Sequence, residues 1–399
     1  MIKLSTKILI IFLAGLLISC NQSSKSSEQE MIIRTIIDET KSAYAPDGRT
    51  EIFDIEIHWS NEGKWVITGE TSNREGKMKL LERLTDSNIG YQDSIQLLPD
   101  SSAVDHPIGL VHISVANLRG EPSFRAELVT QAIFGTPLRI LKDKGWWMLV
   151  QTPDQYISWI NQGGVTLLSE EEYREYLQKP KIIFTEISGS VFQFISGKKQ
   201  IISDLVAGSV LELLGRKNGF DQVKYPDGRK GFIDTCHTEL LDDWAENTNA
   251  SQTSLLDEAR RLMGRPYLWG GTSTKGMDCS GFTKTVYFMN GVLLPRDASQ
   301  QMNTGILVDS TRNFDNLEVG DLLFFGRHAT DSTEVRIVHV AMWIGNGKFI
   351  HASGDVNIRS MDPEDSLYDE YNYNRYIRSK RIINQDENAP AFLKNMGIY

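Results

Sequence analysis

The chain has 399 residues, of which 40% are hydrophobic, enough for two to four domains with separate cores. Its 42 Lys and Arg are outnumbered by 52 Asp and Glu, so the net charge is −10 at pH 7. Because binding to a phosphate backbone needs a positive surface, this balance argues against nucleic acid as a partner. Only three cysteines are present, Cys20, Cys236 and Cys279, so no disulfide framework is expected.

The first twenty residues indicate export. Two lysines precede an apolar run over residues 8–18, which is too short to span a bilayer and is typical of a signal-peptide core. The run leads into Leu17-Ile18-Ser19-Cys20, which resembles a bacterial lipobox. The resemblance implies a signal peptide over residues 1–19 and lipidation of Cys20, and hence a periplasm-facing lipoprotein, most simply on the outer membrane. The alternative is an ordinary signal peptide with an incidental cysteine.

A tether and a small unit follow. Residues 20–30 are rich in Ser, Gln, Asn and charge, a composition typical of a flexible segment. Residues 31–105 are expected to form a small α/β unit in the order helix, strand, strand, helix, strand. Hydrophobic periodicity places these elements over residues 31–42, 52–59, 65–70, 75–85 and 95–98. We find no candidate catalytic residues in this unit. Its candidate roles are to bind a partner or the envelope, or only to extend the reach of the domains that follow.

An internal repeat comes next. A shift of 73 residues superposes identical residues without a gap: Gly135 on Gly208, Leu138 on Leu211, Leu141 on Leu214, Lys144 on Lys217, Val150 on Val223, Pro153 on Pro226, Asp154 on Asp227 and Ile160 on Ile233. Each copy has short alternating strands and a Pro-Asp turn, which is the pattern of a small β-barrel. We therefore expect two barrels, over residues 106–165 and 181–243. A helix over residues 170–177 is predicted between them, with Ser169 and Glu172 in capping-box positions.

Candidate catalytic residues are most concentrated in two segments, Gly264-Arg265-Pro266-Tyr267-Leu268-Trp269-Gly270-Gly271 and Asp278-Cys279-Ser280-Gly281-Phe282. The Gly- and Pro-rich lead-in cannot continue a helix, so it predicts a loop that enters a new helix over residues 280–290. Cys279 then lies in the first turn of that helix. Because the helix dipole and unpaired N–H groups favour a thiolate there, we expect this position to begin activating Cys279 as a nucleophile.

Two histidines flank a predicted hairpin. His339 and His351 lie on alternating apolar runs on either side of Gly345-Asn346-Gly347. A two-residue turn at Asn346 and Gly347 would put the imidazoles on opposite faces, because strand side chains alternate with period two. A three-residue loop over residues 345–347 pairs Ala341 with His351 and places both imidazoles on one face, about 7 Å apart at the backbone. If the histidines act together, the odd-numbered loop is required.

Isolated residues of these types have ordinary explanations. A cysteine on a helix is often a buried small hydrophobe, and a strand histidine is often a satisfied core group. Cys279, His339 and His351 are also zinc-ligand types, although they lack the short paired spacing of structural zinc sites.

Five spaced motifs carry a family resemblance: Pro-Tyr-x-Trp-Gly-Gly at 266–271, Asp-Cys-Ser-Gly-Phe at 278–282, Gly-Asp-Leu-Leu-Phe-Phe at 320–325, His-Val-Ala at 339–341 and His-Ala-Ser at 351–353. With them, residues 255–383 resemble the NlpC-type papain-like cysteine peptidases of bacterial cell walls. The resemblance implies that Cys279 is the nucleophile, His339 the general base and acid, and His351 the residue that orients His339. The backbone N–H of Cys279 is a natural oxyanion donor, and no cofactor is implied.

The barrels resemble the bacterial SH3-like domains that accompany this peptidase type. Residues 115–119 and 124–131 are further similar to the barrel of the γ-D-glutamyl-L-diamino acid endopeptidases, the dipeptidyl-peptidase VI branch that recycles muropeptides. In that branch a barrel glutamate and tyrosine help bind a free N-terminal amino group, which implies Glu127, as a buried carboxylate, and Tyr156. The other substrate-binding residues that the resemblance implies are Tyr267, Asp278, Ser280 and Asp297. Ala298 stands where a serine is expected, and the alternative is that the barrels are only spacers.

The sequence thus predicts a multidomain α+β protein. A papain-like α+β catalytic domain over residues 250–385 follows the small N-terminal α/β unit, the two SH3-like barrels and a linker over 166–180, and a tail occupies 386–399. The expected reaction is hydrolysis of the γ-D-glutamyl to L-diamino acid bond of peptidoglycan peptides, with the membrane contacted through the N-terminal lipid. The alternatives are an endopeptidase or amidase on intact stems, and a catalytically silent wall-binding lipoprotein.

Overall fold

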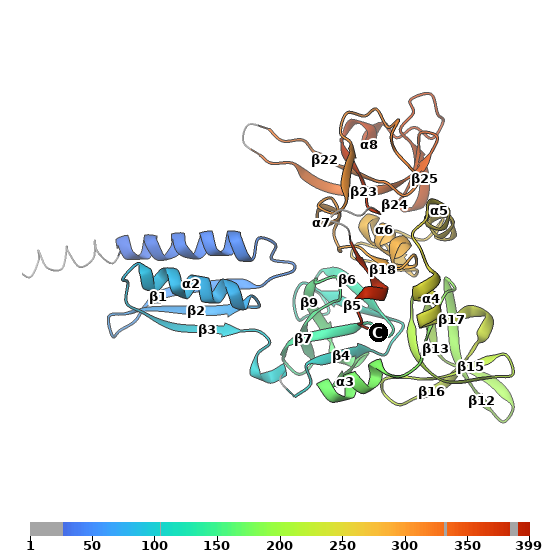
Figure 1. Ribbon diagram of the computed structural model, residues 1–399, viewed down its shortest axis with the longest axis horizontal. Coiled ribbons are helices and arrows are strands. Elements are labelled where there is room, and N and C mark those ends of the chain that lie inside the picture. Colours follow the sequence, from blue (N-terminus) through green and yellow to red (C-terminus); the bar gives the residue numbers. More distant parts are fainter. Residues whose placement is uncertain (1–26, 104, 331–332, 384–389) are drawn as a thin grey trace, which may run out of the picture. The chain divides into compact units, whose positions relative to one another are not determined.

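The computed structural model describes residues 27–383 and 390–399, apart from residues 104 and 331–332. The predicted signal peptide, lipobox and Cys20 lie outside the described residues. The chain divides into two compact units, residues 1–100 and 101–399, which are described separately (Figure 1). None of the helices in the described ranges is long and apolar enough to cross a membrane.

The first unit is a three-stranded sheet with two helices. Its elements are a helix over residues 27–44, β1 (Phe53–Trp59), β2 (Trp65–Thr71), α2 (Arg74–Asp86) and β3 (Tyr91–Leu97), with the sheet order β1-β2-β3. Ile33, Ile36 and Ile37 recur at helical spacing and pack with Leu80 and Leu84 of α2 in the core. Strands β2 and β3 are parallel, so α2 is their crossover helix.

The predicted order of these elements is confirmed, but two predicted boundaries are wrong. The first helix already includes residues 27–30, which were expected in the flexible tether. Strand β3 begins at Tyr91 instead of residue 95. Residues 92–94 are polar and exposed and belong to an edge strand, so hydrophobic periodicity carries no signal for them.

Two seven-stranded sheets begin the second unit. The first contains β4 (Ile108–Val111), β5 (Val115–Arg119), β6 (Leu128–Ile133), β7 (Pro137–Asp143), β8 (Trp147–Gln151), β9 (Ile157–Asn161) and β10 (Val165–Leu168). The second contains β11 (Lys181–Phe184), β12 (Ser188–Ile195), β13 (Lys198–Val206), β14 (Val210–Lys217), β15 (Phe220–Lys224), β16 (Lys230–Asp234) and β17 (Thr238–Leu240). Each sheet encloses a core of its own.

The internal repeat is confirmed strand by strand. A shift of 73 residues carries β4 onto β11 and β9 onto β16 with no change of boundary. The strand order is also the same, β10-β4-β7-β8-β9-β5-β6 in the first sheet and β17-β11-β14-β15-β16-β12-β13 in the second. Between them lies α3 (Glu170–Leu177), at the residues predicted. Its capping box is present, because Ser169 Oγ accepts from the Glu172 N–H at 3.2 Å and Glu172 Oε2 accepts from the Ser169 N–H at 2.8 Å.

The rest of the second unit is built on a six-stranded antiparallel sheet in the order β21-β26-β22-β23-β24-β25. Its helices are α4 (Leu241–Asn247), α5 (Gln252–Arg261), α6 (Cys279–Phe288), α7 (Ala298–Gln301) and α8 (Glu370–Asn374). Its strands are β18 (Thr272–Ser273), β19 (Gly276–Met277), β20 (Val292–Leu293), β21 (Ile306–Asp309), β22 (Leu322–Arg327), β23 (Arg336–Gly345), β24 (Lys348–Ser353), β25 (Asp355–Ser360), β26 (Tyr376–Arg381) and β27 (Ala391–Phe392).

Helix α6 lies between the six-stranded sheet and the barrels (Figure 1). Side chains of β22 and β23 alternate between two cores. Those that pack with Phe282 and Val286 of α6 are Leu322, Phe324, Val340 and Met342. Those on the opposite face are Leu323, Phe325, Ala341 and Trp343. At its far end α6 meets the barrels through Phe288, which lies against Gly208 of the second barrel.

The described C-terminal residues are packed, unlike the tail that the sequence predicted. Strand β27 pairs with β20, with Phe392 opposite Val292. Leu393 is buried in a cluster with Trp244 of α4. The hydroxyl of Tyr173 in α3 donates to the Ile398 carbonyl at 2.7 Å.

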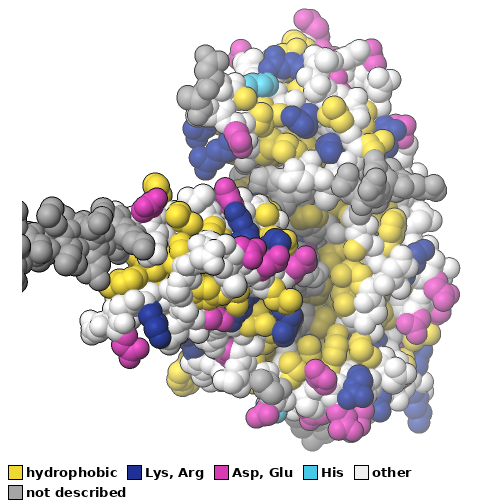
Figure 2. Space-filling view, turned by 60° about the vertical axis from the view of Figure 1, so that its left-hand side comes forward, with side chains coloured by type: hydrophobic (Ala, Val, Ile, Leu, Met, Phe, Trp, Pro, Cys, Tyr) yellow, Lys and Arg dark blue, Asp and Glu magenta, His cyan; other side chains and the backbone are white. Residues whose placement is uncertain are grey.

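On the face shown in Figure 2, acidic and basic side chains are interspersed among hydrophobic ones.

Candidate active site

Cys279 is the first residue of α6, and the preceding Asp278 is its N-cap. Asp278 Oδ1 accepts from the Gly281 N–H at 2.7 Å, and Asp278 Oδ2 accepts from the Gly270 N–H at 3.0 Å. A side chain at Gly281 would put its Cβ 2.0 Å from the Gly271 carbonyl oxygen, so the loop and the helix can approach this closely only at a glycine. The two sequence motifs therefore fold into one structure that holds the cysteine.

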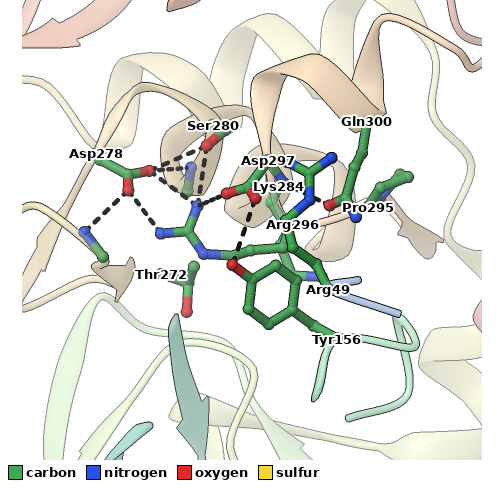
Figure 3. A network of polar contacts seen from close by, with 12 residues as sticks. Arg49, Tyr156, Thr272, Asp278, Ser280, Lys284, Pro295, Arg296, Asp297 and Gln300 are labelled. Atoms are coloured by element: carbon green, nitrogen blue, oxygen red, sulfur yellow. Dashed lines mark hydrogen bonds and ion pairs between the residues drawn. The ribbon is translucent and has the colours of Figure 1, made fainter. Parts of the chain in front are cut away.

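A buried arginine completes this structure. Arg296 is 1% exposed and donates to both Asp278 oxygens, at 2.6 and 3.2 Å, and to Ser280 Oγ at 2.9 Å (Figure 3). Asp278 and Ser280, predicted to bind substrate, are thus buried in a hydrogen-bonded network. Sequence reasoning missed Arg296, although it directly precedes the predicted Asp297 in the chain.

The β23–β24 hairpin brings the two histidines together. His339 Nε2 and His351 Nδ1 are 2.9 Å apart, and both residues are buried. The predicted three-residue loop is wrong in detail. Asn346 and Gly347 form a two-residue turn with positive φ values of 52° and 73°, with Gly345 opposite Lys348, and a bulge at Ile344 then restores the register. The bulge supplies the odd residue that puts both imidazoles on one face.

The thiol lies at the backbone of the residue that follows His339. The backbone N–H of Val340 interacts with the Cys279 sulfur and lowers its pKa. Burial acts more strongly and raises the pKa of Cys279 to about 12, and the Asp278 charge adds to the increase. Burial therefore opposes the activation that the helix N-terminus was expected to begin.

Burial also keeps the histidines neutral. It lowers the pKa of His339 well below 6.5, with a further decrease from His351. It lowers the pKa of His351 to about 4, against an opposing increase from Asp369. The phenyl rings of Phe325 and Phe349 lie 5.8 and 5.0 Å from the imidazoles of His339 and His351 and supply part of this apolar surrounding.

The remaining predicted residues lie around this centre. Burial raises the pKa of Tyr267, and the nearby Cys279 and Asp278 add to the increase. The Tyr156 hydroxyl of the first barrel donates to Asp297 Oδ2 at 3.4 Å (Figure 3). Glu127 is exposed, which corrects the expectation of a buried carboxylate, and its Oε1 accepts from Trp269 Nε1 at 2.6 Å.

A buried ion pair next to Tyr156 joins the first barrel to α6. Lys284 Nζ lies 2.7 Å from Asp154 Oδ2, with side chains 13% and 6% exposed. The sequence carries one signal for this pair, a single charged residue in an otherwise uncharged helix. Within the described residues, no group of three or more His, Cys, Asp or Glu side chains is arranged to hold a metal ion.

Comparisons with known proteins agree with this geometry. Residues 264–381, which include Cys279, His339 and His351, match the NlpC/P60 family model, and residues 118–164 match a bacterial dipeptidyl-peptidase SH3 domain. A Bacillus subtilis protein named gamma-D-glutamyl-L-lysine dipeptidyl-peptidase is 30% identical over 237 residues, which are 56% of this chain and 71% of that protein. The chain belongs to the NlpC/P60 family.

Other relatives extend the similarity over the barrels. Dipeptidyl-peptidase 6 of Lysinibacillus sphaericus is 28% identical over 269 residues, which are 65% of this chain and 93% of that protein. The crystal structure of an NlpC/P60 family protein from Bacillus cereus superposes with a TM-score of 0.58 at 24% identity, over 69% of this chain and 99% of that one. The predicted fold class, a papain-like domain with SH3-like barrels in a multidomain α+β protein, is confirmed.

Proposed function

We propose that the protein is a cysteine endopeptidase that hydrolyses the γ-D-glutamyl to L-diamino acid bond of peptidoglycan peptides. The observation that carries the proposal is the placement of Cys279 at the start of α6, with its sulfur at the backbone N–H of the residue that follows His339 in the buried, hydrogen-bonded His339–His351 pair. Membership of the NlpC/P60 family supports the reaction class. The names of the relatives that also share the barrel support the bond.

The reaction begins from a neutral thiol and a neutral imidazole. Cys279 Sγ attacks the carbonyl carbon of γ-D-Glu while its proton passes to His339, and the Cys279 N–H faces the developing oxyanion. Collapse of the tetrahedral intermediate breaks the C–N bond, and His339 gives its proton to the leaving amine. Water, deprotonated by His339, then attacks the thioester and releases the thiol. His351 keeps the His339 ring in position through the 2.9 Å contact.

The first barrel supplies a candidate subsite for a free N-terminal amine. Tyr156 is buried and Asp297 is 29% exposed on its side chain, so an ammonium between them would meet a carboxylate in a partly dry pocket. Glu127 lies in the same barrel, on the hairpin that contacts Trp269. An acylated amine could not form an ion pair with Asp297, which would favour free muropeptides over intact stems.

The proposal includes export as a lipoprotein tethered through Cys20. It rests on the lipobox-like Leu17-Ile18-Ser19-Cys20 after a short apolar run. Replacing Cys20 by serine should move the protein from the membrane fraction to the soluble fraction of the cells that produce it. If the variant stays in the membrane fraction after a salt wash, lipidation at Cys20 is not what holds it there.

The decisive experiment compares wild type with Cys279→Ala on the free tripeptide L-Ala-γ-D-Glu-diaminopimelate and on intact sacculi, with mass spectrometry of the products. The variant should lose hydrolysis and keep nearly the same melting temperature, since one small buried atom is removed. Residual activity above about a thousandth of wild type would exclude Cys279 as the nucleophile. Stoichiometric zinc in the purified, active enzyme would support the zinc interpretation instead.

A further inference from the structure

A second pair of buried polar groups, on His351 and Asn357, adjoins the pair of histidines. His351 Nε2 and Asn357 Oδ1 are both buried, and neither makes a hydrogen bond of standard geometry with any described residue. The two residues lie directly opposite each other in the β24–β25 pairing. Directly opposite residues in adjacent strands put their side chains on the same face, about 5 Å apart at Cβ. An orphaned ring nitrogen and an orphaned amide oxygen therefore face the same buried space.

We propose that Asn357 is a positioning residue whose Oδ1 accepts a hydrogen bond from His351 Nε2–H and thereby fixes the tautomers of both histidines. The inference rests on the proposed cysteine peptidase function, since it assigns His339 as the base. The bond is closed by rotation about a terminal side-chain torsion, which is soft for both His and Asn.

The orientation of the Asn357 amide is fixed by its other end. Its Nδ2 donates to the Ser353 carbonyl at 3.1 Å, to the Asp355 carbonyl at 3.0 Å and to Asp355 Oδ1 at 2.9 Å. All three partners are acceptors, so the nitrogen must point toward them and the oxygen toward His351. The turn between β24 and β25 thus decides which atom meets the ring.

The tautomers follow from that orientation. An oxygen can only accept, so His351 carries its proton on Nε2 and presents a lone pair at Nδ1. His339 then donates Nε2–H to His351 Nδ1 across 2.9 Å, and its own Nδ1 is left without a proton. This is the nitrogen that remains available to take the Cys279 proton. A donor in place of Asn357 Oδ1 would reverse both tautomers and put a proton on His339 Nδ1, which could then not accept the thiol proton.

Other charged groups act on the same rings. Asp369 raises the pKa of His351, whereas Arg359 and Arg375 lower it, and Arg375 and His351 lower that of His339. The Asn357 side chain also raises the pKa of His351, as an acceptor at Nε2 should. These charges shift how readily the rings are protonated, but an acceptor at Nε2 is what selects between the two neutral tautomers.

Three variants separate this role from a structural one. Asn357→Leu removes the acceptor at nearly constant volume and should lower kcat about 10- to 100-fold with little change in KM, the range found for partners that orient metal-ligating imidazoles. Asn357→Asp keeps an oxygen facing His351 and should recover most of kcat, with the acidic limb of the pH profile moved to higher pH. Asp355→Ala is the matched control, because it removes one partner of Asn357 Nδ2 and leaves Oδ1 in place.

The tautomers of His339 and His351 can be measured in the absence of substrate. In the wild-type protein labelled with ¹⁵N-histidine, NMR at neutral pH should show His351 and His339 both protonated at Nε2. A His351 protonated at Nδ1, an unchanged kcat in Asn357→Leu, or an Asn357→Asp variant as impaired as Asn357→Leu would each overturn the inference. A wild-type enzyme that shows these tautomers but cleaves no peptidoglycan peptide would overturn the proposed function and leave the role of Asn357 intact.

Discussion

Burial decides the protonation states at the candidate active site. Cys279, His339 and His351 are 7%, 7% and 2% exposed. A neutral thiol beside a neutral imidazole avoids a desolvated ion pair at rest, and the two charges form only while the proton moves. The helix N-terminus, which was expected to begin activating Cys279, stabilises the charge that develops during the reaction.

We expect the enzyme to keep its activity at lower pH than an ordinary histidine base allows. The pKa of His351 is lowered to about 4 and that of His339 well below 6.5, because both are buried. Their folded-state pKa values are thus below the unfolded ones, so the base stays neutral as the pH falls through 6.5. kcat/KM, measured at constant ionic strength, should have its acidic limb below about pH 6.

The same shift predicts how stability changes with pH. Below about pH 6.5 the unfolded chain binds protons at these histidines while the folded chain does not, so the free energy of unfolding should fall as the pH decreases toward 4. The His339→Gln variant, which lacks one of the two histidines, provides the check. Its free energy of unfolding should depend less on pH in this window than that of the wild type. An activity limb centred at 6.5 would contradict the buried, neutral pair.

At the scale of elements, the internal repeat shows which structural features a sequence pattern can predict. Pro153-Asp154 and Pro226-Asp227 are equivalent turns 73 residues apart, and the strands around them have equivalent boundaries. Their surroundings differ. Asp154 is 6% exposed on its side chain and pairs with Lys284 of α6, whereas Asp227 is 27% exposed and pairs with its neighbour Arg229. A local pattern fixes the turn, but the contacts of the turn depend on what packs against the barrel.

This contrast gives a matched pair of variants. Asp154→Asn leaves the Lys284 ammonium buried without its charged partner and should lower the free energy of unfolding by about 3 to 5 kcal/mol. Asp227→Asn removes an exposed pair at the same position of the repeat and should cost at most about 1 kcal/mol. Chemical denaturation of both proteins provides the measurement. Equal losses would mean that the Asp154–Lys284 pair does not stabilise the contact between barrel and helix.

The hairpin shows why the rest of the site could not be predicted. Sequence alone required an odd number of residues between the histidine-bearing strands, and the structure supplies it through a bulge at Ile344 instead of a three-residue loop. Both solutions satisfy the same alternation, so periodicity cannot distinguish them. Asn357 could not be found at all, because its importance arises from pairing between β24 and β25, and a single asparagine in a strand carries no signal of its own.

At the scale of the whole molecule, the second unit combines one barrel with the peptidase through polar contacts. Gln131 Oε1 accepts from the Thr272 N–H at 3.1 Å and from Ser273 Oγ at 2.9 Å, close to the loop that holds Cys279. Tyr156 and Glu127 reach Asp297 and Trp269 from the same barrel. Polar pairs of this kind set orientation and specificity more than they add stability. The first barrel therefore meets the peptidase near this loop, as the proposed amine subsite requires.

The amine subsite can be tested by comparing how much kcat/KM falls when each of two carboxylates is replaced. Asp297 is less exposed than Glu127 and pairs with the buried Tyr156, so Asp297→Asn should weaken kcat/KM for free tripeptide by about 1.5 to 3 kcal/mol. Glu127→Gln should cost less than about 1 kcal/mol, as exposed ion pairs do. Glu121→Gln, an exposed change in the same β5–β6 connection, is the control and should have no effect.

Acetylating the substrate amine should damage the wild-type enzyme about as much as Asp297→Asn does, because both changes remove the same contact. For the same reason the two losses should not add when they are combined. Additive losses would place the amine elsewhere. If acetylated tripeptide or intact stems are cleaved as fast as free tripeptide, the barrel does not demand a free amine, and its contacts with the peptidase serve only to hold the two together.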